Sequence, residues 1–153
     1  METQKNISFD ISIPDIVSGY LALSLDDNDL VLYANCGKSL NYVKISIQEI
    51  VAYQVHEEFC HPDMDIGVNL PVPRGGNEEK SVYYPAIEIA NSDWMNSFSE
   101  NRLRDHRRES AKHYRFISFS NVIDVIANSY PVASSISKEE YMEIESIIKN
   151  ALT

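Results

Sequence analysis

The chain contains few of the residues that mark specialised protein classes. Its 153 residues include only 2 cysteines, 5 glycines, 6 prolines and 1 tryptophan. Two cysteines exclude a disulfide-rich secreted scaffold, and so little glycine and proline excludes a collagenous or low-complexity chain. No segment approaches the ~18 consecutive apolar residues of a membrane span. Apolar residues make up 44% of the sequence, which is enough for the core of one globular domain over residues 1–153.

Basic residues are also scarce. The 13 lysines and arginines face 23 acidic residues, so the formal charge is −10. A general nucleic-acid or membrane-surface binder needs a positive surface, and this balance argues against both. Residues 101–115 are the exception: six basic and two acidic side chains give them +4, which leaves −14 for the rest. This run is either an anion-binding site or a solvated segment that pairs with the acidic residues elsewhere in the chain. The candidate anion-binding residues are Arg102, Arg104, Arg107 and Arg108.

The first six residues are polar, and no apolar stretch typical of a secretory signal follows them. We therefore expect a cytoplasmic protein. In that compartment Cys36 and Cys60 are expected to be reduced thiols.

Alternation of apolar and polar residues predicts antiparallel strands. The pattern covers residues 7–13, a hairpin at 20–34, and runs at 43–47, 51–55, 82–90, 113–119 and 122–127. Ser120-Asn121 is the expected two-residue turn of the last hairpin. Residues 60–81 hold prolines, glycines and acids, which predicts a long loop within the single domain.

Two helices are predicted. Ser92 is a candidate N-cap for a short helix over 92–104. A capping box at Ser137 and Glu140 begins an amphipathic helix over 137–152. Its apolar stripe is expected to pack on the sheet, and consists of Tyr141, Ile144, Ile147, Ile148, Ala151 and Leu152. The predicted fold is α+β, with an antiparallel sheet of about seven strands.

Acidic side chains cluster in and beside the expected turns. None follows the twelve-residue calcium-loop pattern, which needs glycine at the sixth position and glutamate at the twelfth. They either keep the protein soluble or form a docking face for a cationic protein partner. The candidate partner-binding residues are Asp26, Asp27, Asp29, Glu57, Glu58, Asp63 and Asp65.

Three side chains that bind transition metals lie close together in the sequence: His56, Cys60 and His61. The two histidines are five residues apart, about 140° around a helix, so a zincin site is excluded. A loop metal site in a small enzyme remains one interpretation. A strand end whose polar groups face water is the other, and no cofactor is expected on that interpretation.

A serine nucleophile is not indicated, because no Gly-x-Ser-x-Gly elbow is present. Trp94 is expected to be a core anchor, and His113 a structural hydrogen-bonding group. The sequence therefore favours a non-enzyme.

Three short segments resemble certain small bacterial proteins: Asn91-Ser92-Asp93-Trp94, His113-Tyr114-Arg115-Phe116 and Ile123-Asp124-Val125-Ile126. Some small acidic members of that group are immunity proteins of polymorphic or contact-dependent toxins. The resemblance covers the second half of the chain and implies no catalytic residue. It implies a non-catalytic module that covers the active site of a cationic, nuclease-like toxin. A structural subunit that assembles through a strand edge or the last helix is a third interpretation.

Overall fold

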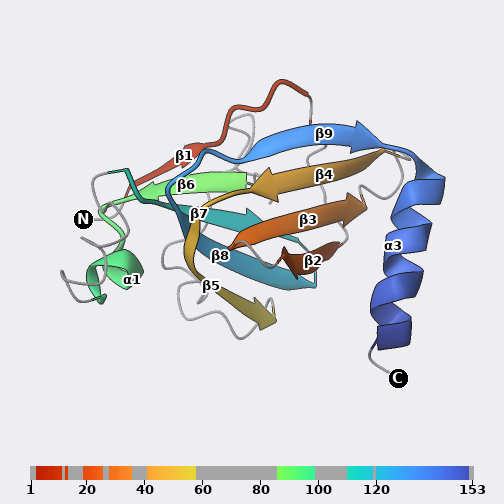
Figure 1. Cartoon of the computed structure of the whole chain (residues 1–153). Helices are drawn as coiled ribbons and strands as arrows, with labels where there is room; N and C mark the ends of the chain where they lie inside the picture. The colour runs from red at the N-terminus through yellow and green to blue at the C-terminus, as the bar shows by residue number, and fades with distance from the viewer. Residues whose placement is uncertain are drawn as a thin grey trace.

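A computed structural model describes residues 3–11, 13, 19–25, 28–35, 41–57, 86–98, 110–118 and 120–151. These residues form two antiparallel sheets and two helices (Figure 1). Sheet A has the order β1 (Thr3–Asn6), β6 (Ala86–Ala90), β7 (Lys112–Ile117), β8 (Asn121–Ala127), β5 (Ile50–Glu57). Sheet B has the order β2 (Gly19–Leu25), β3 (Asp29–Asn35), β4 (Tyr42–Ile47), β9 (Val132–Ile136). The helices are α1 (Asp93–Asn96) and α3 (Lys138–Ala151).

Antiparallel sheets with two helices agree with the expected α+β class, but the arrangement differs from the expected one. The described residues form nine strands in two sheets instead of about seven in one. The difference arises at the junction between β4 and β5. Glu49 there adopts a left-handed backbone conformation, with φ of 54°. This bend sends β5 to pair with β8 in sheet A instead of with β4 in sheet B.

The two strands that the sequence patterns did not predict lie at sheet edges. β9 pairs with β4, although its sequence VASSI is too polar for a clear alternation. β1 pairs with β6 over Thr3–Asn6, before the segment expected to be a strand. The expected strand over residues 7–13 is wrong for its described residues, since none of them belongs to a strand, although the amide of Ile7 donates to the carbonyl of Ala86 at 3.1 Å. The apolar residues at 7 and 13 are instead buried in the core.

The main core lies between the sheets, where the inward side chains of both meet. Sheet B contributes Leu30, Leu32, Ile45 and Ile47, all buried. Sheet A contributes Tyr114, Phe116, Ile123 and Val125 at positions of the same two-residue period. Burial of this apolar surface stabilises the packing of the two sheets, because apolar side chains gain free energy when they leave water.

The two helices cover opposite outer faces. α1 lies on the far side of sheet A from the core, whereas α3 packs on the outer face of sheet B through Tyr141 and Ile144. α1 ends at Asn96 and does not run to 104 as expected. In α3 Tyr141 is buried, Ile144 and Ile148 are half-buried, and Ile147 is exposed, so the predicted stripe is covered unevenly along its described residues. Neither described helix is long and apolar enough to span a membrane.

Candidate functional site

The outer face of sheet A carries a buried network of four polar side chains. Arg115 on β7 and Asp124 on β8 are directly opposed across the two strands, and Arg115 Nε donates to Asp124 Oδ1 at 2.8 Å. The same oxygen is 2.6 Å from Nε2 of His113, which lies two residues before Arg115 on the same face of β7. The other imidazole nitrogen, Nδ1, is 2.6 Å from the hydroxyl of Ser92. The relative exposures of Ser92, His113, Arg115 and Asp124 are 3%, 1%, 2% and 0%.

A fifth side chain reaches the network from the edge strand. Gln54 on β5 lies opposite Asp124, and its amide Nε2 is 3.4 Å from Asp124 Oδ2. Both carboxylate oxygens therefore accept from neighbouring strands of the sheet. A buried charge is tolerated when it is paired and hydrogen-bonded, and this carboxylate meets both conditions.

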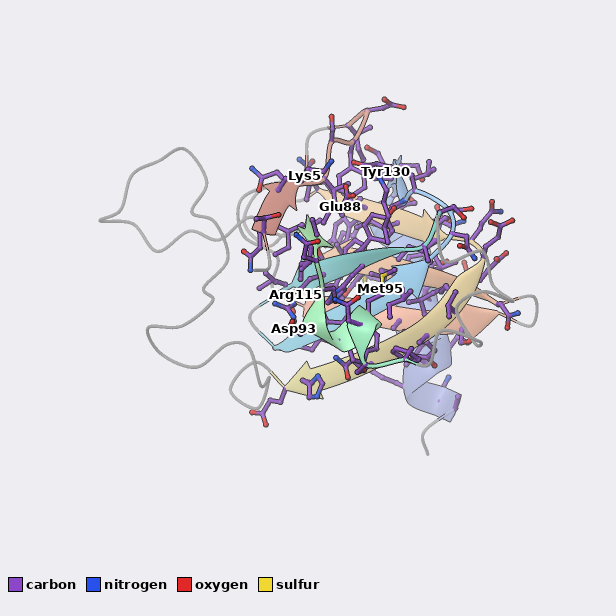
Figure 2. The ribbon with its side chains drawn as sticks, turned by 90° about the vertical axis from the view of Figure 1, so that its left-hand side faces the viewer. Lys5, Glu88, Asp93, Met95, Arg115 and Tyr130 are labelled. Atoms are coloured by element: carbon purple, nitrogen blue, oxygen red, sulfur yellow. The ribbon has the colours of Figure 1, made fainter. Side chains whose placement is uncertain are left out.

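A single helical turn joins this network to the chain between β6 and β7. Asn91 takes a left-handed conformation, with φ of 55°, and turns the backbone into α1. Ser92 is the N-cap, and its Oγ accepts from the amide of Met95 at 3.0 Å. The Trp94 ring is half-buried and packs edge-on against the His113 imidazole, with centroids 5.1 Å apart. Figure 2 shows α1 in front of β7 and β8, with Arg115 beside it.

Serine, histidine and aspartate in one hydrogen-bonded chain are also the components of a hydrolase triad. Here, however, the serine hydroxyl is buried and already bonded to both His113 and the helix turn. The order of the contacts also differs. The Ser92 hydroxyl contacts Nδ1 of His113, and the Asp124 carboxylate contacts Nε2, whereas in the serine-protease triad the nucleophilic serine contacts Nε2 of the histidine. The arrangement attaches α1 to sheet A. His113 is thus a structural hydrogen-bonding group, and Trp94 packs on it at the surface and not in the core.

Sequence reasoning singled out Ser92 and His113 but did not place Asp124 and Arg115 beside them. The hairpin closes between Ser118 and Asn121, where Ser118 Oγ donates to the Asn121 carbonyl at 2.9 Å. A turn at residues 120–121 would instead pair residue 119 with residue 122. The expected turn is therefore wrong by one position, and the pairing of β7 with β8 differs from the expected pairing by two residues. Arg115 then lies opposite Asp124 and not opposite Ile126.

The metal interpretation rests on residues that the structure describes only in part. His56 lies on β5 and is half-buried, whereas Cys60 and His61 lie outside the described residues. Within the described ranges, no group of three or more His, Cys, Asp or Glu side chains is placed to hold a metal ion.

Two of the seven candidate partner-binding acids are described, and they lie at opposite ends of β5. The backbone amide of Ile50, the first residue of β5, donates to the carbonyl of Asn28 at 2.8 Å, which places Asp29 beside that end. Glu57 is the last residue of β5 and is exposed. Seven steps of about 3.3 Å separate the ends of the strand by roughly 23 Å. The remaining candidate residues lie outside the described part of the chain: Asp26, Asp27, Glu58, Asp63, Asp65, Arg102, Arg104, Arg107 and Arg108.

β5 itself is an edge strand with exposed apolar side chains. It pairs with β8 on one side, and no described strand pairs with its other side (Figure 1). Tyr53 and Val55 project from the same face and are 46% and 49% exposed. A long edge strand with exposed apolar residues is a ready surface for pairing with another chain. We call Asp29, Tyr53, Val55 and Glu57, together with the backbone of β5, the acidic edge.

Comparisons of this chain with protein-family models, with curated proteins and with solved structures find no match.

Proposed function

We propose that the protein is a non-catalytic binding module that neutralises a cationic, nuclease-like toxin domain by covering its active surface, as an immunity protein does. The observation that carries this proposal is the acidic edge. It combines the exposed apolar area of Tyr53 and Val55 with two carboxylates, Glu57 at the end of β5 and Asp29 of β3 beside the start of β5. Interfaces of this kind obtain binding energy from the apolar centre, whereas the charges accelerate association and select the partner.

The charge balance supports the same kind of partner. The chain carries −10 overall and −14 outside residues 101–115. A nuclease needs a positive surface to hold its polyanionic substrate. An acidic inhibitor is therefore attracted to the surface that it must cover, and long-range attraction raises the association rate most at low ionic strength.

Co-expression tests the proposal directly. The protein encoded by the neighbouring upstream reading frame is expressed in a bacterial host with and without this chain, and growth is measured. We expect the upstream protein to arrest growth and this chain to restore it. A harmless upstream protein, or an arrest that this chain does not relieve, would contradict toxin neutralisation.

Association kinetics test the role of charge. The double variant Asp29→Lys with Glu57→Lys is expected to slow association with the toxin domain by about tenfold or more at low salt, and by less at high salt. The matched control is Glu139→Lys with Glu143→Lys on α3, which changes the net charge equally on exposed residues of another element. Equal slowing by both double variants would show that net charge alone acts and that these two residues form no docking site.

A further inference from the structure

We propose that the partner inserts an apolar side chain, flanked by lysine or arginine, between the core-facing residues of β2 and β5. This inference rests on the proposed function and specifies how the partner is held. Four exposed side chains form the docking surface, which we call the β2–β5 surface: Ala22, Ser24, Tyr53 and Val55. None of the four is charged, so together they offer a contact of low polarity on an acidic molecule.

On β5, Tyr53 and Val55 point to the face of sheet A that carries the core. Tyr53 lies opposite Val125 of β8, and Val55 lies opposite Ile123. Directly opposed residues of an antiparallel pair project on the same face, and both of these β8 residues are buried in the core between the sheets. Tyr53 and Val55 are nevertheless about half exposed. The core face of sheet A therefore continues on β5 beyond the part that sheet B covers.

β2, a strand at the end of sheet B, shows the same feature. Ala22 lies opposite Leu32 of β3, and Ser24 lies opposite Leu30. Both leucines are buried in the core, so Ala22 and Ser24 also point to the core face. Both are exposed. Core-facing side chains of β2 and β5 are thus accessible from outside.

Contacts at both ends place β2 alongside β5. At one end the backbone amide of Ile50, the first residue of β5, donates to the carbonyl of Asn28 between β2 and β3 at 2.8 Å. At the other end the side-chain amide of Asn121 donates to the carbonyl of Tyr20 at 3.1 Å. Asn121 in turn pairs with Glu57, the last residue of β5. The exposed core-facing residues of the two strands lie between these ends and therefore flank the same side of the sandwich.

The sizes of these side chains determine what can fit between them. Packed sheets lie about 10 Å apart, and interdigitating side chains fill the layer between them. Ala22 and Ser24 are too small to fill this layer at the margin, so Tyr53 and Val55 keep much of their apolar surface in water. A side chain of the size of leucine or phenylalanine would cover that surface, and its burial would stabilise the complex.

Charge favours a basic partner over a second copy of this chain. Asp29 follows Asn28, whose carbonyl accepts from the first residue of β5, so a carboxylate lies at one end of the β2–β5 surface. A lysine or arginine beside the inserted side chain would be attracted to this carboxylate and to the net charge of −10. Two copies of the chain repel each other through the same charge. The occupant is therefore an apolar side chain within a basic segment of the proposed toxin domain.

The first experiment titrates the isotope-labelled protein with the peptide Lys-Lys-Leu-Lys-Lys, blocked at both ends, and follows the NMR signals of the backbone amides. We expect the signals of the β2–β5 surface to shift. A peptide of equal charge with serine in place of leucine should bind about tenfold more weakly, because it has no apolar side chain to bury. No binding, shifts confined to other elements, or equal affinities of the two peptides would overturn the inference.

A matched pair of variants tests the surface itself. Ser24→Phe fills the space that the inserted side chain would take and should weaken binding of the leucine peptide about tenfold or more. The control is Ser134→Phe on β9, an exposed serine at the other end of sheet B that points away from the core, and it should bind like wild type. Unchanged affinity of Ser24→Phe would contradict the inference. So would a wild-type dimer that Ser24→Phe dissociates, because the occupant would then be a second copy.

The co-expression assay separates this inference from the proposed function. If Ser24→Phe restores growth as well as wild type does, the β2–β5 surface is not the docking site and the function survives. If the leucine peptide binds this surface but wild type restores no growth, the function fails and the apolar docking site survives.

Discussion

The outer faces of the two sheets are covered by helices that are attached in different ways. α3 lies on sheet B through an apolar contact, in which Tyr141 packs against Tyr42 with ring centroids 4.9 Å apart. α1 is attached to sheet A through a hydrogen-bonded chain, in which the Ser92 hydroxyl pairs with His113 and His113 pairs with the buried carboxylate of Asp124. Apolar packing tolerates small shifts of the partners, whereas a buried charge network requires every member in place. The two faces should therefore respond differently to single substitutions.

The largest effect is expected from Asp124→Ala. It removes the carboxylate that neutralises the buried Arg115, and breaking a buried ion pair from one side costs about 3–5 kcal/mol of the free energy of unfolding. Urea denaturation measures this loss. The double variant Asp124→Asn with Arg115→Met removes both charges and should recover part of the stability. A loss below about 1 kcal/mol, the range of exposed pairs, would contradict the charge network.

On the other face, Tyr141→Ala is expected to cost about 3 kcal/mol, because it deletes the one fully buried side chain of α3. Ile147→Ala, on an exposed position of the same helix, should change the free energy of unfolding by about 0.5 kcal/mol or less. Similar losses for the two variants would mean that the attachment of α3 does not depend on its first turns.

The two N-cap serines provide a direct comparison. Ser137 Oγ accepts from the amide of Glu140 at 3.1 Å and is exposed, so Ser137→Ala should cost about 1 kcal/mol. Ser92 has the same capping role and also bonds to buried His113, so Ser92→Ala should cost about 2 kcal/mol. Thermal or urea unfolding of both variants measures the difference. An equal cost would show that the bond between Ser92 and His113 contributes nothing to stability.

The smallest effect concerns alkaline pH. Burial, and secondarily the charge of Glu140, raise the pKa of Tyr33 on the outer face of sheet B above its ordinary value of 10.0. Above that pH the unfolded chain releases a proton that the folded chain retains. Stability therefore falls as the pH rises from about 10 through the pKa of the folded state. Tyr33→Phe should reduce this fall, and Glu140→Gln should reduce it less. An unchanged pH profile in Tyr33→Phe would refute this assignment.

Local patterns predicted most strands and both helix starts. Seven of the nine described strands coincide with alternating runs, and both N-cap serines are where the sequence places them. The strand β9 was missed because its sequence VASSI has two serines at its centre and shows no clear alternation of apolar and polar residues. The end of α1 at Asn96 was also missed, because helical propensity does not specify where a short helix stops.

The candidate site was less predictable than the fold. The acidic residues were visible in the sequence, but nothing local indicated that Asp29 of β3 would lie beside the start of β5, the strand that ends at Glu57. The buried network was hidden because a one-residue error in the hairpin turn moves Arg115 away from Asp124. A side chain belongs to a network only through its cross-strand neighbours, and these depend on register.

The sequence by itself determined an acidic chain rich in alternating strands, the two serine-capped helix starts and the positions of the acidic residues in the sequence. These properties follow from composition and from the two local periods of strand and helix. Only the tertiary structure decided that the strands divide into two sheets, that His113, Arg115 and Asp124 share one buried network, and that β5 is the last strand of sheet A among the described residues. These outcomes depend on which strands pair, and pairing is decided by contacts between residues far apart in the chain.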